Sequence, residues 1–174
     1  MPATRFSTTV LVGVIPVLAA FTLAGCSKSS PTAPTVPAAA IQAAGEGALV
    51  LHPSVDLRYV VALETPLRIR ETGGGTATWN FARMSFKKGG VEIERSEMGA
   101  SALSASGFAR VAANSSELRK LVFRLNSPDF DAVTITLGFG DNKDGRQFSV
   151  DVPFVFSDVT ISLTPLNVPV NRVE

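Results

Sequence analysis

Few side chains in this sequence have the type and spacing that catalysis or metal binding requires. His52 is the single histidine and Cys26 the single cysteine among 174 residues. Catalysis by serine, histidine and aspartate would have to use His52, yet no serine lies in a G-x-S-x-G sequence. The commonest zinc sites need three or four histidine or cysteine ligands, so one of each excludes them unless carboxylates substitute. Because His52 precedes Pro53 at the end of an expected strand, we interpret it as structural or solvent-facing.

Two nearby carboxylates could carry out glycoside hydrolysis. Glu92 and Glu94 are two apart on an expected strand, which places them on one face about 6.5–7 Å apart at Cα. Val91 and Ile93 alternate with them on the other, buried face, and Arg95 follows directly. A solvated outer face explains this pattern, because a catalytic acid generally needs burial.

Two loops offer groups that bind ions. Asp141–Gly145 reads DNKDG, and oxygen donors with a turn glycine are what a calcium loop uses. Lys143 occupies a position where such a loop needs another donor, so a plain hairpin turn is favoured. The glycine triplet Gly73–Gly75 could cradle a phosphate, but no lysine motif or helix follows it, and a hairpin loop is the simpler interpretation.

Sugar-binding sandwiches present exposed aromatic platforms, for which Trp79 and Tyr59 are the candidates. Trp79 shares an expected strand face with Phe81, and Tyr59 shares one with Leu57 and Val61. We therefore interpret both as core residues. The sequence predicts no catalytic, cofactor-binding or metal-binding residue.

The N-terminus has the pattern of an export signal. Arg5 supplies a positive charge, and residues 10–23 are almost wholly apolar. Fourteen helical residues span roughly 21 Å, short of the ~30 Å hydrocarbon core of a membrane. We therefore expect residues 1–25 to be a cleaved signal peptide. Beyond Arg5, fifteen basic and fifteen acidic residues balance, which argues against a nucleic-acid partner.

The apolar run ends in Leu23-Ala24-Gly25-Cys26, which resembles the lipobox of bacterial lipoproteins. The resemblance implies cleavage before Cys26, a diacylglyceryl group on its thiol and often an acyl group on its new amine. Two or three chains of this kind hold a protein firmly in a membrane. In Gram-negative lipoproteins an aspartate just after the cysteine retains the protein in the inner membrane, and here Ser27 and Lys28 follow instead. For an organism with an outer membrane, the resemblance therefore implies sorting to that membrane. The alternative is an ordinary signal peptide in which Cys26 is incidental.

Residues 26–45 are expected to be a tether. Pro31, Pro34 and Pro37 recur every three residues, which favours an extended spacer reaching about 55 Å over eighteen residues. Such a segment cannot bury enough apolar surface to fold alone, and we expect it to be disordered. A proline-rich ligand for another protein is the alternative.

Residues 46–165 carry the alternation of half-buried strands, with turn residues between the runs. Alternating runs occur at 57–63, 67–70, 91–94, 121–125, 133–139, 148–154 and 159–163. A change of phase within 76–86 predicts a β-bulge near Ala82 or Arg83. Pro66 predicts either an edge strand or two strands that switch sheets there.

These patterns predict an all-β fold, an antiparallel two-sheet sandwich, followed by a tail at 166–174. The runs PLRIRETGGGTATWNFARMSF, LVFRLN and AVTITLGFGDNKDGRQFSV resemble bacterial immunoglobulin-like domains. The chain lacks the paired cysteines of antibody domains, so fibronectin-like or other sandwich topologies stay open. The resemblance implies a surface role and no particular ligand.

We therefore expect a lipid-anchored, non-enzymatic protein of the bacterial cell envelope, favouring the outer membrane, on its periplasmic or surface face. Its partners would be the membrane, through Cys26, and another envelope or extracellular protein. A carbohydrate- or calcium-binding surface domain is the alternative function.

Overall fold

The computed structural model describes residues 35–155, 157 and 159–166, which contain ten strands and one short helix. The signal peptide, Cys26 and the tail from residue 167 lie outside these residues. The elements are β1 (Ile41–Gly45), β2 (Leu49–Pro53), β3 (Val61–Glu71), β4 (Ala77–Lys88), β5 (Val91–Gly99), α1 (Ala100–Ala105), β6 (Arg110–Val111), β7 (Ser116–Leu125), β8 (Ala132–Asp141), β9 (Gln147–Val155) and β10 (Val159–Ile161).

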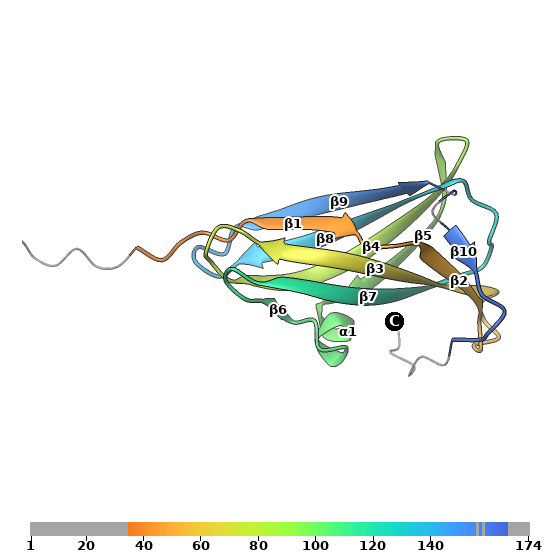
Figure 1. Cartoon of the computed structure of the whole chain (residues 1–174), viewed down its shortest axis with the longest axis horizontal. Helices are drawn as coiled ribbons and strands as arrows, with labels where there is room; N and C mark the ends of the chain where they lie inside the picture. The colour runs from red at the N-terminus through yellow and green to blue at the C-terminus, as the bar shows by residue number, and fades with distance from the viewer. Residues whose placement is uncertain (1–34, 156, 158, 167–174) are drawn as a thin grey trace, which may run out of the picture. The chain divides into compact units, whose positions relative to one another are not determined.

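The strands form two packed sheets (Figure 1). In the first, β3 pairs with β7 along one edge, while β1 and β2 share its other edge and β10 lies beside β2. In the second, the order is β5-β4-β8-β9, with the short β6 also beside β4. The β10–β2 pair is parallel and the other pairs are antiparallel. The predicted all-β sandwich is confirmed.

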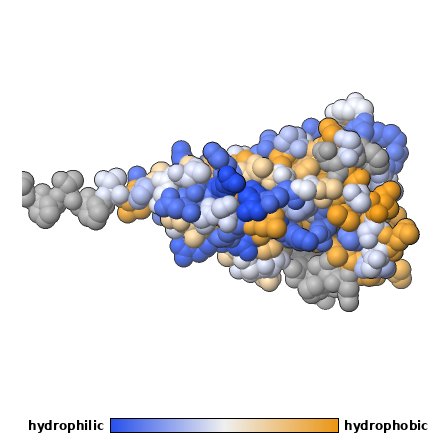
Figure 2. Space-filling view, viewed as in Figure 1, coloured by the Kyte–Doolittle hydropathy of each residue, from blue (hydrophilic) through white to orange (hydrophobic). Residues whose placement is uncertain are grey.

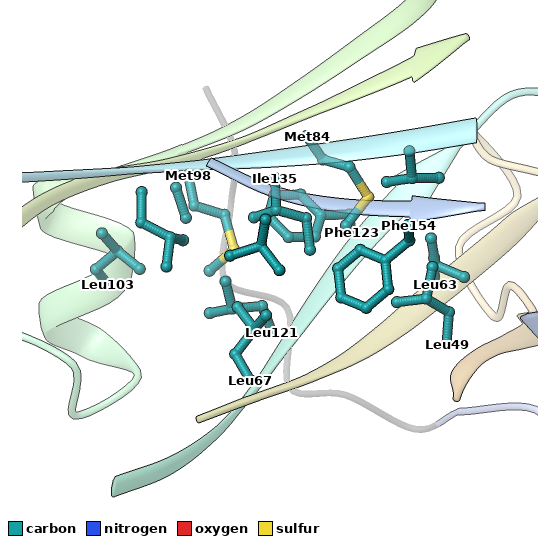
Figure 3. Close-up of a cluster of buried hydrophobic side chains, with 14 of the residues drawn as sticks. Leu49, Leu63, Leu67, Met84, Met98, Leu103, Leu121, Phe123, Ile135 and Phe154 are labelled. Atoms are coloured by element: carbon teal, nitrogen blue, oxygen red, sulfur yellow. The ribbon is translucent and has the colours of Figure 1, made fainter. Parts of the chain in front are cut away.

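The core lies between the sheets and follows from the period-two alternation. On β8, Ile135, Leu137 and Phe139 are fully buried, as the sequence pattern predicts. Figure 3 shows Leu63 and Phe123 of the first sheet pointing toward side chains of the second. Burial of each such side chain contributes about 1.5–3 kcal/mol, so these faces hold the two sheets together.

β3 passes through Pro66 without a break, so neither alternative for this proline is correct. The Pro66 carbonyl accepts a hydrogen bond from the Glu46 backbone N–H at 3.0 Å, on the edge that β1 and β2 share. Backbone N and O of one residue face the same neighbour in an antiparallel ladder. The missing N–H of Pro66 therefore faces the gap between β1 and β2, and the ladder to β7 is intact.

The strand predicted to begin at Leu57 begins at Val61 instead. Residues 54–60 form a loop in which the Asp56 carboxylate accepts the Arg58 backbone N–H at 3.1 Å and the Asp56 carbonyl accepts that of Tyr59 at 2.9 Å. Such local bonds compete with a strand ladder. Leu57 is fully exposed, and Tyr59 is only half-buried, so the core interpretation of Tyr59 is wrong.

The bulge in β4 lies at Asn80, two residues before the predicted position. The register with β8 shifts between Trp79 and Phe81, which turns Phe81 to the outer face. There the ring lies so close to Gly138 that a Cβ on this glycine would come within 2.0 Å of it. Trp79 is buried in the core as predicted, and its indole N–H donates to the Phe81 carbonyl at 2.9 Å.

Candidate functional site

The two ends of the sandwich differ in chemistry, and β3 connects them. Its first residue, Val61, lies beside the loop 54–60, and its last, Glu71, receives the chain arriving from the N-terminus. At ~3.3 Å per residue these ends are about 33 Å apart. We call the Glu71 end, with residues 37–40, 73–75 and Asp141, the dock.

Glu71 is the centre of the dock. Its side chain is only 3% exposed and accepts four backbone N–H groups, those of Ala40 at 2.9 Å, Gly73 at 2.8 Å, Gly74 at 3.0 Å and Asn114 at 2.8 Å. Burial raises the pKa of this carboxyl, but the four N–H donors outweigh burial and hold the pKa below its ordinary value of 4.5. The ionised carboxylate thus joins three separate segments of the chain.

Asp141 binds the residue before Ala40. One carboxylate oxygen accepts the Ala39 backbone N–H at 3.0 Å, and the other accepts that of Lys143 at 2.9 Å. The loop Asp141–Gly145 is the hairpin turn predicted from its composition, and it joins β8 to β9. Within the described ranges, no group of three or more histidines, cysteines or acids gathers to hold a metal ion.

The glycine triplet accommodates the chain's own backbone. A Cβ on Gly73 would lie 2.3 Å from the Ala38 carbonyl oxygen, and one on Gly75 would lie 2.5 Å from the Ala39 nitrogen. Real Cβ atoms do not come this close to backbone, so only glycine admits residues 38 and 39. The structure therefore brings together two motifs that the sequence presented separately, Gly73–Gly75 and Asp141–Gly145.

From the dock the chain continues as a strand, which places the start of the domain earlier than predicted. β1 pairs with β3 from Ile41 opposite Glu71 to Gly45 opposite Leu67. The expected tether, residues 26–45, thus gives its last residues to the sandwich. We call residues 37–45 the strap. The sequence signal is weak there because AIQAAG contains only one large apolar residue.

The paired-carboxylate hypothesis fails because of a bulge in β5. The register with β4 places Glu94 opposite Phe86 and Glu92 opposite Lys87, so Ile93 is the extra residue. Because directly opposed residues share a face, Glu94 lies on the inner face with Phe86 and Glu92 on the outer face.

The partners of the two glutamates agree with this assignment. The Glu94 carboxylate accepts the backbone and side-chain N–H groups of Asn126, each at 3.0 Å, next to the first sheet. Glu92 bonds to Ser85 and Arg95, which pair with each other on the outer face. Val91 and Ile93 are exposed, so their predicted burial is also wrong.

His52 lies on β2, immediately before its end at Pro53, as expected. Its Nδ1 is 3.0 Å from the Thr164 carbonyl oxygen, and since a carbonyl can only accept, Nδ1 donates. This bond fixes the segment that follows β10 against β2. Within residues 35–155, 157 and 159–166, Nε2 has no hydrogen-bond partner. The structural interpretation of His52 is supported.

The end opposite the dock carries a surface that the sequence did not predict. Among residues 35–155, 157 and 159–166, five exposed aliphatic side chains lie there, and we call them the apolar tip: Val55, Leu57, Val60, Ile161 and Leu163. Leu57 is 100% exposed, Leu163 91% and Ile161 70%. Figure 2 shows apolar residues gathered at this end, where β2, β10 and the loop 54–60 meet.

The sequence matches no protein-family model, and no curated protein matches it significantly. Solved structures similar to this chain include the crystal structure of an ApaA protein from Bordetella pertussis. The identity is 13%, the alignment covers 69% of this chain and 94% of that chain, and the TM-score is 0.44. No helix in the described part of the chain is long and apolar enough to cross a membrane.

Proposed function

We propose that this chain is a lipid-anchored lipoprotein of the bacterial cell envelope, and that its sandwich is a non-enzymatic interaction or structural module. The Leu23-Ala24-Gly25-Cys26 motif after an apolar run supports the anchor. The dock is the observation that supports the proposal most. There the buried carboxylates of Glu71 and Asp141 bind the backbone of Ala40 and Ala39, at the end of the expected tether. Because the end of the tether is bound to the sandwich, we propose that the anchor and the domain act together.

The hydrogen bonds of the two buried acids and of Glu94, one of the candidate catalytic carboxylates, favour a non-enzymatic role. The Glu71 and Asp141 carboxylates accept backbone N–H groups, and Glu94 accepts those of Asn126. Each group thus has a structural task. The alternative of carbohydrate or calcium binding is weakened, because Trp79 is buried and both carboxylate oxygens of Asp141 are occupied by the protein itself.

The anchor is tested by metabolic labelling of the full chain with an alkyne analogue of palmitate. We expect the wild type to carry the label and to sediment with membranes, and the Cys26→Ser variant to lose both properties. The matched control Ser30→Ala leaves the motif intact and keeps them. A wild type without label, or a labelled Cys26→Ser variant, contradicts the proposal.

Protease treatment of intact cells that express the same variants determines on which side of the outer membrane the domain lies. Cleavage of the wild type on whole cells places the domain outside the cell. Protection until the outer membrane is opened places it in the periplasm, and a role in envelope assembly then replaces a role at the surface.

A further inference from the structure

The outer face of the first sheet carries a hollow beside the strap. Its volume is about 480 Å³, and its walls come from β1 and from the neighbouring stretch of β3. Gln42 lies opposite Arg70 in the β1–β3 ladder, and Ala44 lies opposite Arg68. Directly opposed residues share a face, so these four side chains stand on the outer face. Because Ala44 and the next residue, Gly45, are small, they leave open space beside the two arginines.

The two arginines differ in how their guanidinium groups are used. Arg68 donates Nε–H and one Nη2–H to the two carboxylate oxygens of Glu46. A guanidinium has five N–H donors, so three remain on Arg68. Within residues 35–155, 157 and 159–166, neither Arg70 nor Gln42 forms a side-chain hydrogen bond, and Arg70 forms no ion pair. The hollow therefore offers several N–H donors and two guanidinium groups against one carboxylate.

The surrounding face has the same sign of charge. Among the described residues, four cations and two carboxylates lie on the outer face of the first sheet: Arg68, Arg70, Lys120, Arg124, Glu46 and Glu64. Glu64 pairs with Lys120 at 2.8 Å, as Glu46 pairs with Arg68. Figure 2 shows hydrophilic residues gathered over β1 and β3. The face therefore has two more positive than negative charges, and it is complementary to an anionic surface.

We propose that this hollow binds a phosphate group, and that the phosphate belongs to an anionic lipid headgroup. A guanidinium fork can bond two phosphate oxygens at once, and the fork of Arg70 is available for this. The lipid source rests on the proposed function. Eleven positions separate Cys26 from Pro37, where the strap begins, and they extend to about 34 Å in a polyproline conformation. With Cys26 in a membrane, the strap is therefore within reach of the headgroups.

A protein carboxylate fits the hollow less well than a phosphate does. Donor groups line the hollow from both walls, Gln42 on β1 and the two arginines on β3. A carboxylate offers two oxygens and one negative charge, and Glu46 already fills that role for Arg68. A phosphate monoester offers three oxygens and more than one negative charge near neutral pH, so it can accept from all three donor groups.

The test follows thermal unfolding of the full chain, incorporated into vesicles through its own N-terminal part. Trp79 is the single tryptophan and is buried in the core, so its fluorescence reports unfolding of the sandwich. A ligand that binds only the native state raises Tm. We compare vesicles of phosphatidylcholine with vesicles that also contain phosphatidic acid, whose phosphate is exposed, and expect the phosphatidic acid to raise Tm by about 3 °C or more.

A second arm separates the two sources of phosphate. The full chain in detergent is melted with inorganic phosphate and with sodium chloride at the same ionic strength. A rise in Tm with phosphatidic acid supports the lipid headgroup. A rise with inorganic phosphate alone supports the phosphate site but overturns the lipid source in favour of a soluble phosphate.

Three variants locate the effect in the hollow. Arg70→Gln removes the available guanidinium, and we expect the rise in Tm to be lost. Arg110→Gln is the matched control, because Arg110 is also exposed and forms no ion pair among the described residues, yet lies on β6 of the second sheet. It removes the same charge and should keep the rise. Ala44→Leu fills the hollow without changing any charge, and the rise should fall by about half or more.

A wild type whose Tm responds to neither probe overturns the inference. So does a response that Arg70→Gln or Ala44→Leu leaves unchanged, or one that Arg110→Gln loses equally, since net charge alone would then explain it. Labelling of Cys26 distinguishes the two proposals. A labelled chain without a response sinks only this inference, whereas an unlabelled chain sinks the proposed function and leaves the inorganic phosphate arm readable.

Discussion

The dock and the apolar tip are built on the two ends of the same strand, and they treat exposed backbone and side chains in opposite ways. At the dock, Glu71 and Asp141 accept backbone N–H groups of the strap, and glycines let it approach closely. At the tip, the side chains of Leu57, Ile161 and Leu163 are exposed. The comparison teaches that, within the described residues, this sandwich covers one end with its own backbone and exposes aliphatic side chains at the other.

The two ends should therefore contribute very differently to folding. A buried N–H left without an acceptor costs about 1–3 kcal/mol. Removal of the Glu71 or Asp141 carboxylate at the dock should therefore lower the free energy of unfolding. An exposed aliphatic side chain gains little from the folded state, since folding has not removed it from water. Substitutions can test this contrast.

The largest effect is expected at Glu71. Glu71→Ala leaves four backbone N–H groups without their acceptor, and we expect the free energy of unfolding to fall by about 3 kcal/mol or more. Denaturant titration measures it. Glu64→Ala is the matched control, because Glu64 lies on the same strand and forms a surface ion pair with Lys120 at 2.8 Å. That pair is worth about 0–1 kcal/mol, so equal losses for the two variants would refute the special role of the dock.

Close approach at the glycine loop gives the next largest effect. Gly75→Ala places a Cβ against the Ala39 nitrogen, and we expect a loss of about 2 kcal/mol as the strap shifts. Gly99→Ala is the control, since a Cβ there meets no atom within 4 Å and its φ is −79°. Proteolysis just before β1 should speed up in the first variant alone. Unchanged proteolysis in Gly75→Ala would show that the strap does not depend on this contact.

Acid should weaken the dock by less than removal of Glu71 does, because a protonated carboxyl keeps part of its acceptor capacity. The pKa of Glu71 is lowered in the folded state, so its contribution is fully present above 4.5 and is lost as pH falls through the lowered value. The protection of the Ala40 amide against hydrogen exchange, taken relative to the intrinsic exchange rate at each pH, should therefore fall below pH 4.5 in the wild type. In Glu71→Gln this pH dependence should be absent, and its persistence would assign the effect to other acids.

The smallest effect is expected at the apolar tip. Leu57→Ser changes a side chain that is 100% exposed, and we expect the free energy of unfolding to change by less than about 0.5 kcal/mol. Leu63→Ser is the contrasting control, because Leu63 is fully buried at the start of β3, six residues further along the chain. This substitution should lower the free energy of unfolding by several kcal/mol. Denaturant titration compares the two. A large loss for Leu57→Ser would mean that the tip stabilises the fold, and the comparison of the two ends would fail.

The sequence predicts the sandwich well where large apolar residues alternate without interruption. Ile135, Leu137 and Phe139 of β8 are buried as expected, and the turn Asp141–Gly145 lies where its composition indicates. Prediction fails where one inserted residue changes the phase. Asn80 turns Phe81 outward, and Ile93 separates Glu92 from Glu94. In β4 both phases offer apolar residues, so the pattern alone does not locate the bulge, and in β5 the alternation of Val91 and Ile93 with two glutamates gives no sign of one.

The dock could not be predicted for a different reason. Ala40 and Asn114 are 31 and 43 residues from Glu71 in the chain, and both contribute backbone N–H groups, which every residue type except proline possesses. No side-chain pattern therefore marks them. The glycine triplet was the available signal, because three consecutive glycines indicate that something approaches the backbone. That the approaching group is the chain itself follows only from the structure.

The direction of β1 determines how the domain responds to tension. The strap enters at the dock, and β1 runs from Ile41 at this end toward the opposite end, antiparallel to β3. If the chain before β1 is pulled away from the dock while the rest of the sandwich is held, the force acts along the axis of β1. Its five register pairs with β3 then resist together, in shear, instead of opening one after another as in peeling. The sandwich is thus attached to its tether in the orientation in which a short strand withstands the greatest force.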